Sequence, residues 1–267
     1  MPFVTANGID LYYELAGAGE RLLFISGTGA DLRRSPRLTD GPAFAAFELL
    51  QYDQRGLGRS AVPAAPYTMA DYADDAAGLL DAVGWDRCLV LGVSFGGMVA
   101  QELAIRHPER VRRLVLACTS AGGDGGASYP LHELVGLDAE ASLATRFQLL
   151  DTRWDAAWRA DNPEMVAMIA ERFRLGSDDG PEEGPLRQLE ARRHHDTSAR
   201  LGQIGCPTLV CGGRYDGIAP PANSEFLAAK IPGATLSLFD GGHLFFMQDP
   251  SAMPAILDFL GAAPDPV

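Results

Sequence analysis

The sequence predicts an α/β fold, a doubly wound and mostly parallel sheet with an inserted helical cap. Three observations lead to this fold class. Apolar runs of strand length recur along the chain, and such runs are typical of strands covered on both faces. Helical patterns alternate with these runs, which favours parallel pairing. One long stretch, residues 120–201, breaks the alternation and carries helical patterns without a convincing strand.

The chain begins with the pattern of an antiparallel hairpin. Polarity alternates over residues 3–6, Asn7 and Gly8 follow, and the pattern resumes over 9–15. Asn-Gly between two such runs is a strong short-range signal for a β-hairpin. We therefore expect the parallel sheet to carry an antiparallel hairpin at its start.

The remaining strands and helices follow in alternation. Continuous apolar runs predict strands at residues 22–25, 48–52, 88–93, 111–118, 208–211 and 234–239. Helical patterns predict helices at 69–83, 95–107, 223–230 and 252–260. Because helices that connect parallel strands pack on the faces of the sheet, both faces should be covered.

Residues 120–201 are interpreted as a cap. A glycine-rich segment at 122–126 precedes helical pieces near 141–150, 154–160, 163–175 and 185–195. Helices inserted between two sheet strands have room only over the strand ends. A separate helical domain is the less favoured alternative, because the chain returns to the sheet at Pro207. The predicted division is a core of residues 1–119 and 202–267 and a cap of residues 120–201.

Composition and charge limit the classes of function. The 267 residues are 47% hydrophobic, which is enough to fill a substantial core. The net charge of −13 argues against nucleic acid as a partner, because the phosphate backbone would be repelled. The chain shows neither a signal-peptide pattern nor an apolar run of about 18 residues, the length of a membrane span. We expect a cytoplasmic protein that binds a small-molecule substrate and no membrane; homo-oligomerisation stays open.

The cysteines and histidines indicate neither a metal site nor a cofactor. Four cysteines stand in or beside apolar runs without a Cys-x-x-Cys pair. They are interpreted as small buried residues in a reducing compartment, although a disulfide between close pairs stays open. His194 and His195 are adjacent, and adjacent side chains on a helix diverge, so they make a poor chelate. We expect no metal and no cofactor.

A serine stands where a strand turns into a helix. The segment Gly-Val-Ser-Phe-Gly-Gly at 92–97 follows an apolar run and precedes a helical pattern. Such a corner strains its central residue and requires small neighbours, as Gly92 and Gly96 are. Ser94 would project from the carboxyl edge of the sheet, with the Phe95 amide at a helix N-terminus, where negative charge is stabilised. The pattern suits an attacking hydroxyl, but short matches also arise by chance.

A serine nucleophile needs a base, and position in the chain selects one histidine. His243 follows the last strand, at the carboxyl edge where α/β sheets build their sites. The other four histidines end a helix or fall in the cap: His107, His132, His194 and His195. His243 is therefore the candidate base.

The base in turn needs a carboxylate that fixes its tautomer and stabilises its charged form. Asp216 lies in the loop that leaves the strand at 208–211, at the same edge of the sheet. Asp216 is the candidate acid. An accessory acid from the cap, formed by His194 and His195 with Asp196, is the less favoured alternative.

Ser94, Asp216 and His243, in this order and each after a strand, resemble the α/β-hydrolase superfamily. The matching motifs span nearly the whole chain: YDQRGLGRS at 52–60, GVSFGG at 92–97, GRYDGIAP at 213–220 and DGGHLFF at 240–246. Together, at these separations, they are specific. The resemblance implies a serine hydrolase that uses the three residues as a catalytic triad.

The resemblance also implies an oxyanion hole. The backbone amide of Thr28, in the loop after Ile25, would join the amide of Phe95. This loop reads Ser-Gly-Thr-Gly at 26–29, whereas the family commonly has His-Gly. A backbone donor does not depend on that side chain, so the oxyanion hole is expected to be retained. Similar serine-containing loops are found among relatives of enol-lactonases and aminoacrylate hydrolases.

Three residues outside the triad are candidate substrate contacts. Arg33 follows the oxyanion loop and could clamp a substrate carboxylate, although arginines in loops are commonly solvated. Trp154 and Trp158 could face the site from the cap, although aromatic residues at helical spacing more often pack against the sheet. Asp53 and Arg55 are interpreted as structural residues that hold loops by charge-assisted hydrogen bonds.

The sequence therefore predicts a capped serine hydrolase that cleaves a carboxylic ester or a lactone through an acyl-enzyme intermediate. Hydrolysis of a carbon–carbon bond in a diketone, amide hydrolysis and cofactor-free perhydrolase activity stay open, since one triad can serve them all. A non-catalytic binder of small molecules on the same fold is the alternative from another class. Such proteins usually lose a triad member, whereas this chain keeps all three.

Overall fold

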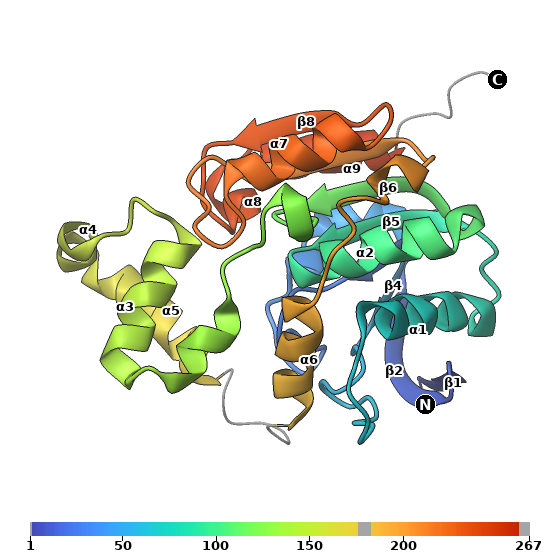
Figure 1. The fold of residues 1–267 in the computed structure, drawn as a ribbon, viewed down its shortest axis with the longest axis horizontal. Coiled ribbons are helices and arrows are strands. Elements are labelled where there is room, and N and C mark those ends of the chain that lie inside the picture. The colour runs from blue at the N-terminus through green and yellow to red at the C-terminus, as the bar shows by residue number, and fades with distance from the viewer. Residues whose placement is uncertain (1, 176–182, 262–267) are drawn as a thin grey trace.

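A computed structural model of the chain describes residues 2–175 and 183–261. Within these ranges eight strands form one sheet in the order β1-β2-β4-β3-β5-β6-β7-β8 (Figure 1). The strands are β1 Phe3–Ala6, β2 Ile9–Ala16, β3 Glu20–Ile25, β4 Phe47–Tyr52, β5 Cys88–Val93, β6 Val111–Ala117, β7 Thr208–Gly213 and β8 Thr235–Phe239. The pairs β1–β2 and β2–β4 are antiparallel, and all pairs from β4 to β8 are parallel. The predicted fold class is confirmed.

Helices cover both faces of the sheet. The helices α1 Met69–Ala82, α2 Phe95–Arg106 and α7 Pro221–Lys230 pack on one face, and α9 Ala252–Gly261 packs on the other. Successive strand residues point to opposite faces, so Leu22 and Leu23 belong to different hydrophobic clusters. The short helix α8 Phe245–Gln248 is not predicted, because one turn is too short to show a helical period.

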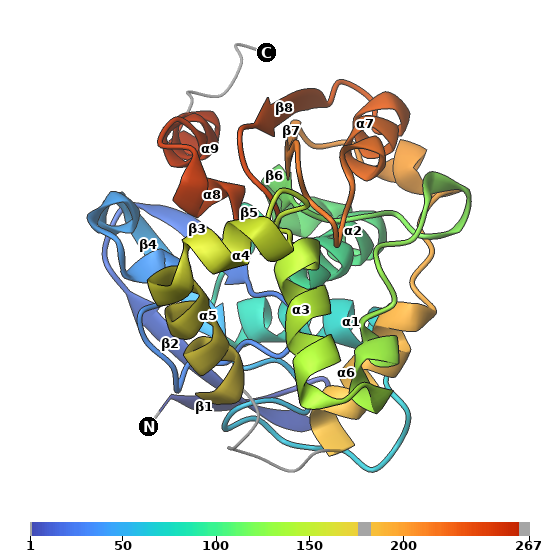
Figure 2. The ribbon, with the colours of Figure 1, turned by 90° about the vertical axis from the view of Figure 1, so that its left-hand side faces the viewer.

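Among the described residues, four α-helices lie between β6 and β7. They are α3 Ala139–Leu150, α4 Ala156–Asp161, α5 Pro163–Leu175 and α6 Glu183–Arg193. Figure 1 shows α3, α4 and α5 grouped to one side of the sheet, with α6 between this group and α1; Figure 2 shows the same group from its outer side. The division into a core and a cap stays a prediction, and residues 176–182 of that cap lie outside the described residues.

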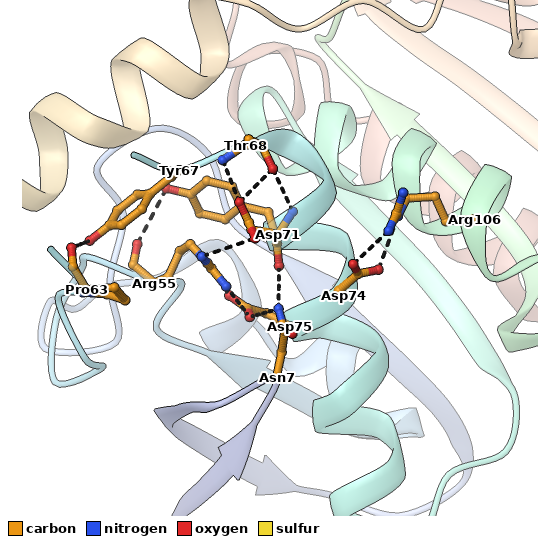
Figure 3. Close-up of polar contacts among 10 residues, drawn as sticks. Asn7, Arg55, Pro63, Tyr67, Thr68, Asp71, Asp74, Asp75 and Arg106 are labelled. Carbon is orange, nitrogen blue, oxygen red and sulfur yellow. Dashed lines mark hydrogen bonds and ion pairs between the residues drawn. The ribbon is translucent and has the colours of Figure 1, made fainter. Parts of the chain in front are cut away.

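A buried ion pair joins the loop after β4 to helix α1. The Nε and Nη2 atoms of Arg55 donate to the Asp75 carboxylate at 2.6 and 2.7 Å, and the Asn7 side chain donates to it at 3.0 Å (Figure 3). In the same loop, the Asp53 carboxylate accepts from the backbone amide of Leu32 at 2.6 Å. These contacts agree with the structural role expected of Asp53 and Arg55.

Two properties of the described ranges bear on the environment of the protein. No helix there combines the length and the apolar composition that crossing a membrane requires. The four cysteines, all inside these ranges, are free thiols, and three of them are buried. Burial raises the pKa of the Cys88 thiol to about 12, so this thiol stays protonated and packs as a small apolar group.

Candidate active site

Ser94 occupies the corner between β5 and α2. Its φ of 56° and ψ of −114° lie outside the regions that residues with a side chain prefer. The corner is tight, since a Cβ added to Gly96 would clash with the carbonyl oxygen of Ile25, and one added to Gly92 would clash with Gly96 itself. The expected need for small residues on both sides of the serine is thus met.

The structure brings Ser94, His243 and Asp216 together. His243 follows β8 and Asp216 follows β7; His243 Nδ1 lies 2.8 Å from Asp216 Oδ2, and Nε2 lies 3.0 Å from Ser94 Oγ. All three residues are buried, with exposed fractions of 8% or less. Because an ionised carboxylate can only accept, Nδ1 carries the hydrogen, and Nε2 is left to accept from the serine hydroxyl.

The second oxygen of Asp216 is also fixed. Oδ1 accepts from the backbone amides of Ile218 and Ala219, both at 2.8 Å. Hydrogen bonds of this kind stabilise the ionised form of a carboxylate. They leave Oδ2 to hold the imidazole in one tautomer and one orientation.

The last turn of α3 holds the two loops that carry the acid and the base. The amide of Gly217 donates to the Leu149 carbonyl at 3.1 Å, and the amide of His243 donates to the Leu150 carbonyl at 2.6 Å. Sequence reasoning missed both carbonyls, because a backbone acceptor leaves no signature in the residue type. Helix α3 therefore helps to place Asp216 and His243 relative to each other.

The loop after β3 lies beside the nucleophile. A Cβ added to Gly27 would be 3.5 Å from Ser94 Cβ, and the hydroxyl of the next residue, Thr28, is buried without a hydrogen-bond partner among the described residues. Phe95 is fully buried at the first position of α2. This location is what the predicted oxyanion hole requires. The assignment of the Thr28 and Phe95 amides as its donors stays a prediction.

A glutamine that the sequence did not reveal supports this loop. Gln188 on α6 accepts from the amide of Gly29 at 2.8 Å, and Gln54 donates to the carbonyl of Ser26 at 2.9 Å. Gln188 and Gly29 are 159 residues apart, so no local pattern connects them. Helix α6 thereby fixes the loop that faces Ser94.

A family model described as alpha/beta hydrolase fold matches residues 20–250. The chain belongs to the α/β hydrolase fold family. The 3-oxoadipate enol-lactonase 2 of Acinetobacter baylyi is 30% identical in an alignment of 257 positions that covers 93% of this chain and 92% of the relative. The 2-hydroxymuconate semialdehyde hydrolase of Pseudomonas sp. strain CF600 is 33% identical in an alignment of 276 positions, gaps included, that covers 97% of this chain and 93% of the relative. The crystal structure of the enol-lactonase from Burkholderia xenovorans LB400 superposes on this structure with a TM-score of 0.78 at 28% identity. The superposition covers 97% of this chain and 99% of the enol-lactonase.

The candidate substrate contacts of this α/β hydrolase have protein partners in the structure. The guanidinium of Arg33 donates to the Asp31 carboxylate at 3.0 and 2.9 Å. Trp154 and Trp158 stack with their ring centroids 4.7 Å apart, and Trp154 also packs against an apolar cluster that contains Ile218. The substrate-binding roles of Arg33, Trp154 and Trp158 stay predictions.

The two adjacent histidines of the hydrolase each contact an oxygen of the protein. His194 Nε2 lies 2.8 Å from a Glu190 oxygen, and His195 Nε2 lies 3.2 Å from the carbonyl oxygen of Ser120. Burial lowers the pKa of His195 to about 4, so its ring is neutral near pH 7. The alternative of an accessory acid at this pair gains no support.

One cavity of the hydrolase is distant from the triad. It measures about 500 Å³ and is lined by Glu20, Arg21, Cys88 and Arg112, among others. These residues mark the amino ends of β3, β5 and β6, whereas Ser94, Asp216 and His243 follow the carboxyl ends of their strands. The cavity is therefore no part of the catalytic arrangement.

Proposed function

We propose that this α/β hydrolase cleaves a carboxylic ester or a lactone through an acyl-enzyme on Ser94. The observation that carries the proposal is the pair of hydrogen bonds that connects Asp216 to His243 at 2.8 Å and His243 to Ser94 at 3.0 Å. The similarity to two enol-lactonases, which by their names open a cyclic enol ester, supports this bond type.

Acylation begins with attack of Ser94 Oγ on the substrate carbonyl carbon. His243 Nε2 takes the hydroxyl proton, and Asp216 stabilises the imidazolium that forms. The carbonyl electron pair moves onto its oxygen, which the amides of Thr28 and Phe95 would bind; such a donor is worth roughly 3 kcal/mol. Collapse of this intermediate breaks the bond to the leaving oxygen, which receives the proton from His243.

Deacylation repeats these proton transfers with water. His243 takes a proton from a water molecule, which attacks the acyl carbon and forms a second oxyanion. Collapse then releases the carboxylic acid and returns the proton to Ser94 Oγ. In a lactone the leaving oxygen remains part of the product, so one open-chain hydroxy acid or keto acid results.

Hydrolysis of a carbon–carbon bond is the second candidate function. It is favoured by the 33% identity to a 2-hydroxymuconate semialdehyde hydrolase over 97% of the chain, since the compound in that name contains no ester linkage. The triad and the oxyanion loop suit both reactions, because each begins at a carbonyl carbon. The difference lies in the leaving group, which is an oxygen in one case and a carbon in the other.

The role of Ser94 is tested first by labelling with a fluorophosphonate probe. We expect the wild type to be labelled and Ser94→Ala to remain unlabelled and folded, with Ser251→Ala, at an exposed serine far along the chain, as the matched control. Turnover in Ser94→Ala should fall by about 10⁴-fold or more, because triad residues act as a unit. A folded wild type that takes no label would instead favour a non-catalytic binder.

The bond type is tested with a substrate panel. Aryl esters of graded chain length, five- and six-membered lactones, and a dienoic diketone are compared by kcat/KM. We expect ester or lactone turnover to dominate. Turnover of the diketone alone would transfer the assignment to carbon–carbon hydrolysis.

A further inference from the structure

A second, smaller cavity adjoins the first turn of α2. It measures about 110 Å³ and is lined by Met98, Ser120, Ser128, Arg192 and His195, among others. Pockets that enclose a whole ligand usually measure roughly 300 Å³ or more. This cavity therefore fits one functional group of a ligand rather than the entire molecule.

The cation in its wall is buried without a carboxylate. Arg192 is 6% exposed; its Nη1 donates to the Tyr129 carbonyl at 2.8 Å and its Nη2 donates to the Ser128 hydroxyl at 2.7 Å, while Nε has no partner in the part of the chain that the structure describes. No Asp or Glu of that part pairs with it. Burial lowers the pKa of its guanidinium to about 10, so the group is still charged at neutral pH.

Arg55 shows how the same chain treats a buried arginine with a structural role. Burial alone would lower the pKa of its guanidinium, but the Asp75 carboxylate against it raises that pKa above its ordinary value. A buried charge without such a partner is costly. The lack of a carboxylate at Arg192 therefore indicates that its counter-charge comes from a ligand.

Two further polar atoms, both on residues that line the cavity, have no hydrogen-bond partner within the described ranges. They are the hydroxyl of Ser120, 1% exposed, and Nδ1 of His195, 5% exposed. Because His195 Nε2 faces the Ser120 carbonyl oxygen, which can only accept, Nε2 carries the hydrogen and Nδ1 is an acceptor. A carboxylate could thus accept from Arg192 Nε and from the Ser120 hydroxyl, while His195 Nδ1 accepts from a neighbouring hydroxyl, N–H group or water.

The cavity lies close to the nucleophile. The amide of Met98 donates to the Ser94 carbonyl at 3.3 Å, and the hydroxyl of Thr119, the residue before Ser120, donates to the same carbonyl at 2.7 Å. On α6, Gln188 and Arg192 are four residues apart and share one face, about 6 Å apart along the helix axis. Gln188 contacts the loop beside Ser94, so this face of α6 connects that loop with the cavity.

We propose that the cavity at Arg192 binds a carboxylate group of the substrate, carried on the acyl chain at a distance from the carbonyl that Ser94 attacks. The inference rests on the proposed function for the position of that carbonyl. It narrows the substrate class to esters or lactones whose product is a dicarboxylic acid.

The test compares charged and neutral substrates of equal chain length. Monomethyl succinate, glutarate and adipate are compared with methyl butyrate, valerate and hexanoate in a pH-stat assay. We expect one of the half esters to be preferred by the wild type. In Arg192→Gln, kcat/KM for that half ester should fall about tenfold or more, and for the neutral ester less than about threefold, because hydrogen bonds to charged groups are the strong ones.

Two variants separate binding from folding. Ser120→Ala deletes only an unpartnered hydroxyl, so it should fold and lower the half-ester rate alone, by about threefold. Arg187→Gln removes another arginine of α6, which contacts Pro63 and Glu183, and should leave the preference unchanged. A wild type without preference, or equal losses on both substrates in Arg192→Gln, would overturn the proposal.

A binding measurement distinguishes failure of this inference from failure of the proposed function. Glutarate should raise the melting temperature of Ser94→Ala, and the rise should vanish in the double variant Ser94→Ala/Arg192→Gln. If the wild type hydrolyses neither these esters nor the aryl esters and lactones of the substrate panel, the proposed function fails and this measurement alone decides the carboxylate site. Absence of the rise in Ser94→Ala, or its persistence in the double variant, would refute the site.

Discussion

The cluster of Ser94, His243 and Asp216 and the cluster of Arg55 and Asp75 are both buried and both held by short hydrogen bonds. The first contains an imidazole, whose two nitrogens can accept and release a proton. The second contains a guanidinium, which keeps its charge at every ordinary pH. One cluster can therefore pass a proton along its hydrogen bonds, whereas the other holds two fixed charges.

The difference shows that burial and hydrogen bonding do not by themselves identify a catalytic group. The partners decide: Arg55 and Asp75 satisfy each other inside the protein (Figure 3). His243 connects a carboxylate to a hydroxyl. Substitution in the first cluster should therefore cost turnover, and substitution in the second should cost stability.

The largest effect is expected at the acid of the triad. Asp216→Asn should lower kcat by about 10³–10⁴-fold, because the amide favours the wrong tautomer of His243. The unfolding free energy should change little, since the remaining carbonyl oxygen can still accept from the Ile218 and Ala219 amides. Asp240→Asn, at a carboxylate 71% exposed in the neighbouring loop, is the control, and kcat and urea unfolding are the measurements. If Asp216→Asn were inactive because it unfolds, the contrast between a catalytic cluster and a stabilising cluster would be lost.

The next effect is expected at the ion pair. Asp75→Asn should lower the unfolding free energy by about 3 kcal/mol in urea titration, because the buried Arg55 guanidinium loses its closest carboxylate and keeps only that of Asp71, at 3.7 Å. Turnover per folded molecule should stay near the wild-type value. If folded Asp75→Asn loses turnover instead, the ion pair takes part in catalysis and the two clusters are less distinct than proposed.

A buried histidine outside both clusters extends the comparison to pH. His195 has a folded-state pKa of about 4, below the roughly 6.5 of an unfolded chain. The unfolded state therefore binds the proton first, and stability is lost as the pH falls from about 6.5 towards 4, by roughly 2–3 kcal/mol. Urea titrations at both ends of this window should show the loss in the wild type and in His194→Gln, which alters an exposed ring. His195→Gln should lose less unfolding free energy than the wild type over this pH window, by roughly the same 2–3 kcal/mol. An unchanged pH dependence in His195→Gln would contradict the assignment of this loss to His195.

The smallest effect is expected at an exposed ion pair beside the buried one. Arg106 donates to Asp74 at 2.7 Å, with both side chains about one third exposed (Figure 3). Arg106→Gln should lower the unfolding free energy by about 1 kcal/mol or less, and by less still at high salt, because solvent screens such pairs. If Arg106→Gln lowered the unfolding free energy as much as Asp75→Asn, solvent exposure would not explain the difference expected between the two ion pairs.

The sequence by itself determined the local structure and the residues that the triad uses. Asn7 and Gly8 specify a tight turn, and Gly92 and Gly96 permit the strained corner at Ser94; such requirements act over a few residues and are readable without a fold. The apolar runs located the strands of the sheet. Element boundaries depend on caps as well as on apolar periodicity: the helix predicted at 154–160 begins at 156, after Asp155 as its N-cap.

Tertiary structure alone decided which groups become partners. The carbonyls of Leu149 and Leu150 support the catalytic loops. Because every residue has a backbone carbonyl, the residue type does not predict which carbonyl accepts such a hydrogen bond. Arg55 and Arg192 are the same residue type and both are buried. Arg55 forms an ion pair with Asp75 of helix α1, whereas Arg192 contacts only neutral oxygens of Ser128 and Tyr129 among the described residues. The physical reason is that pairing depends on distances between elements far apart in the chain, and packing sets those distances only when the whole fold has formed.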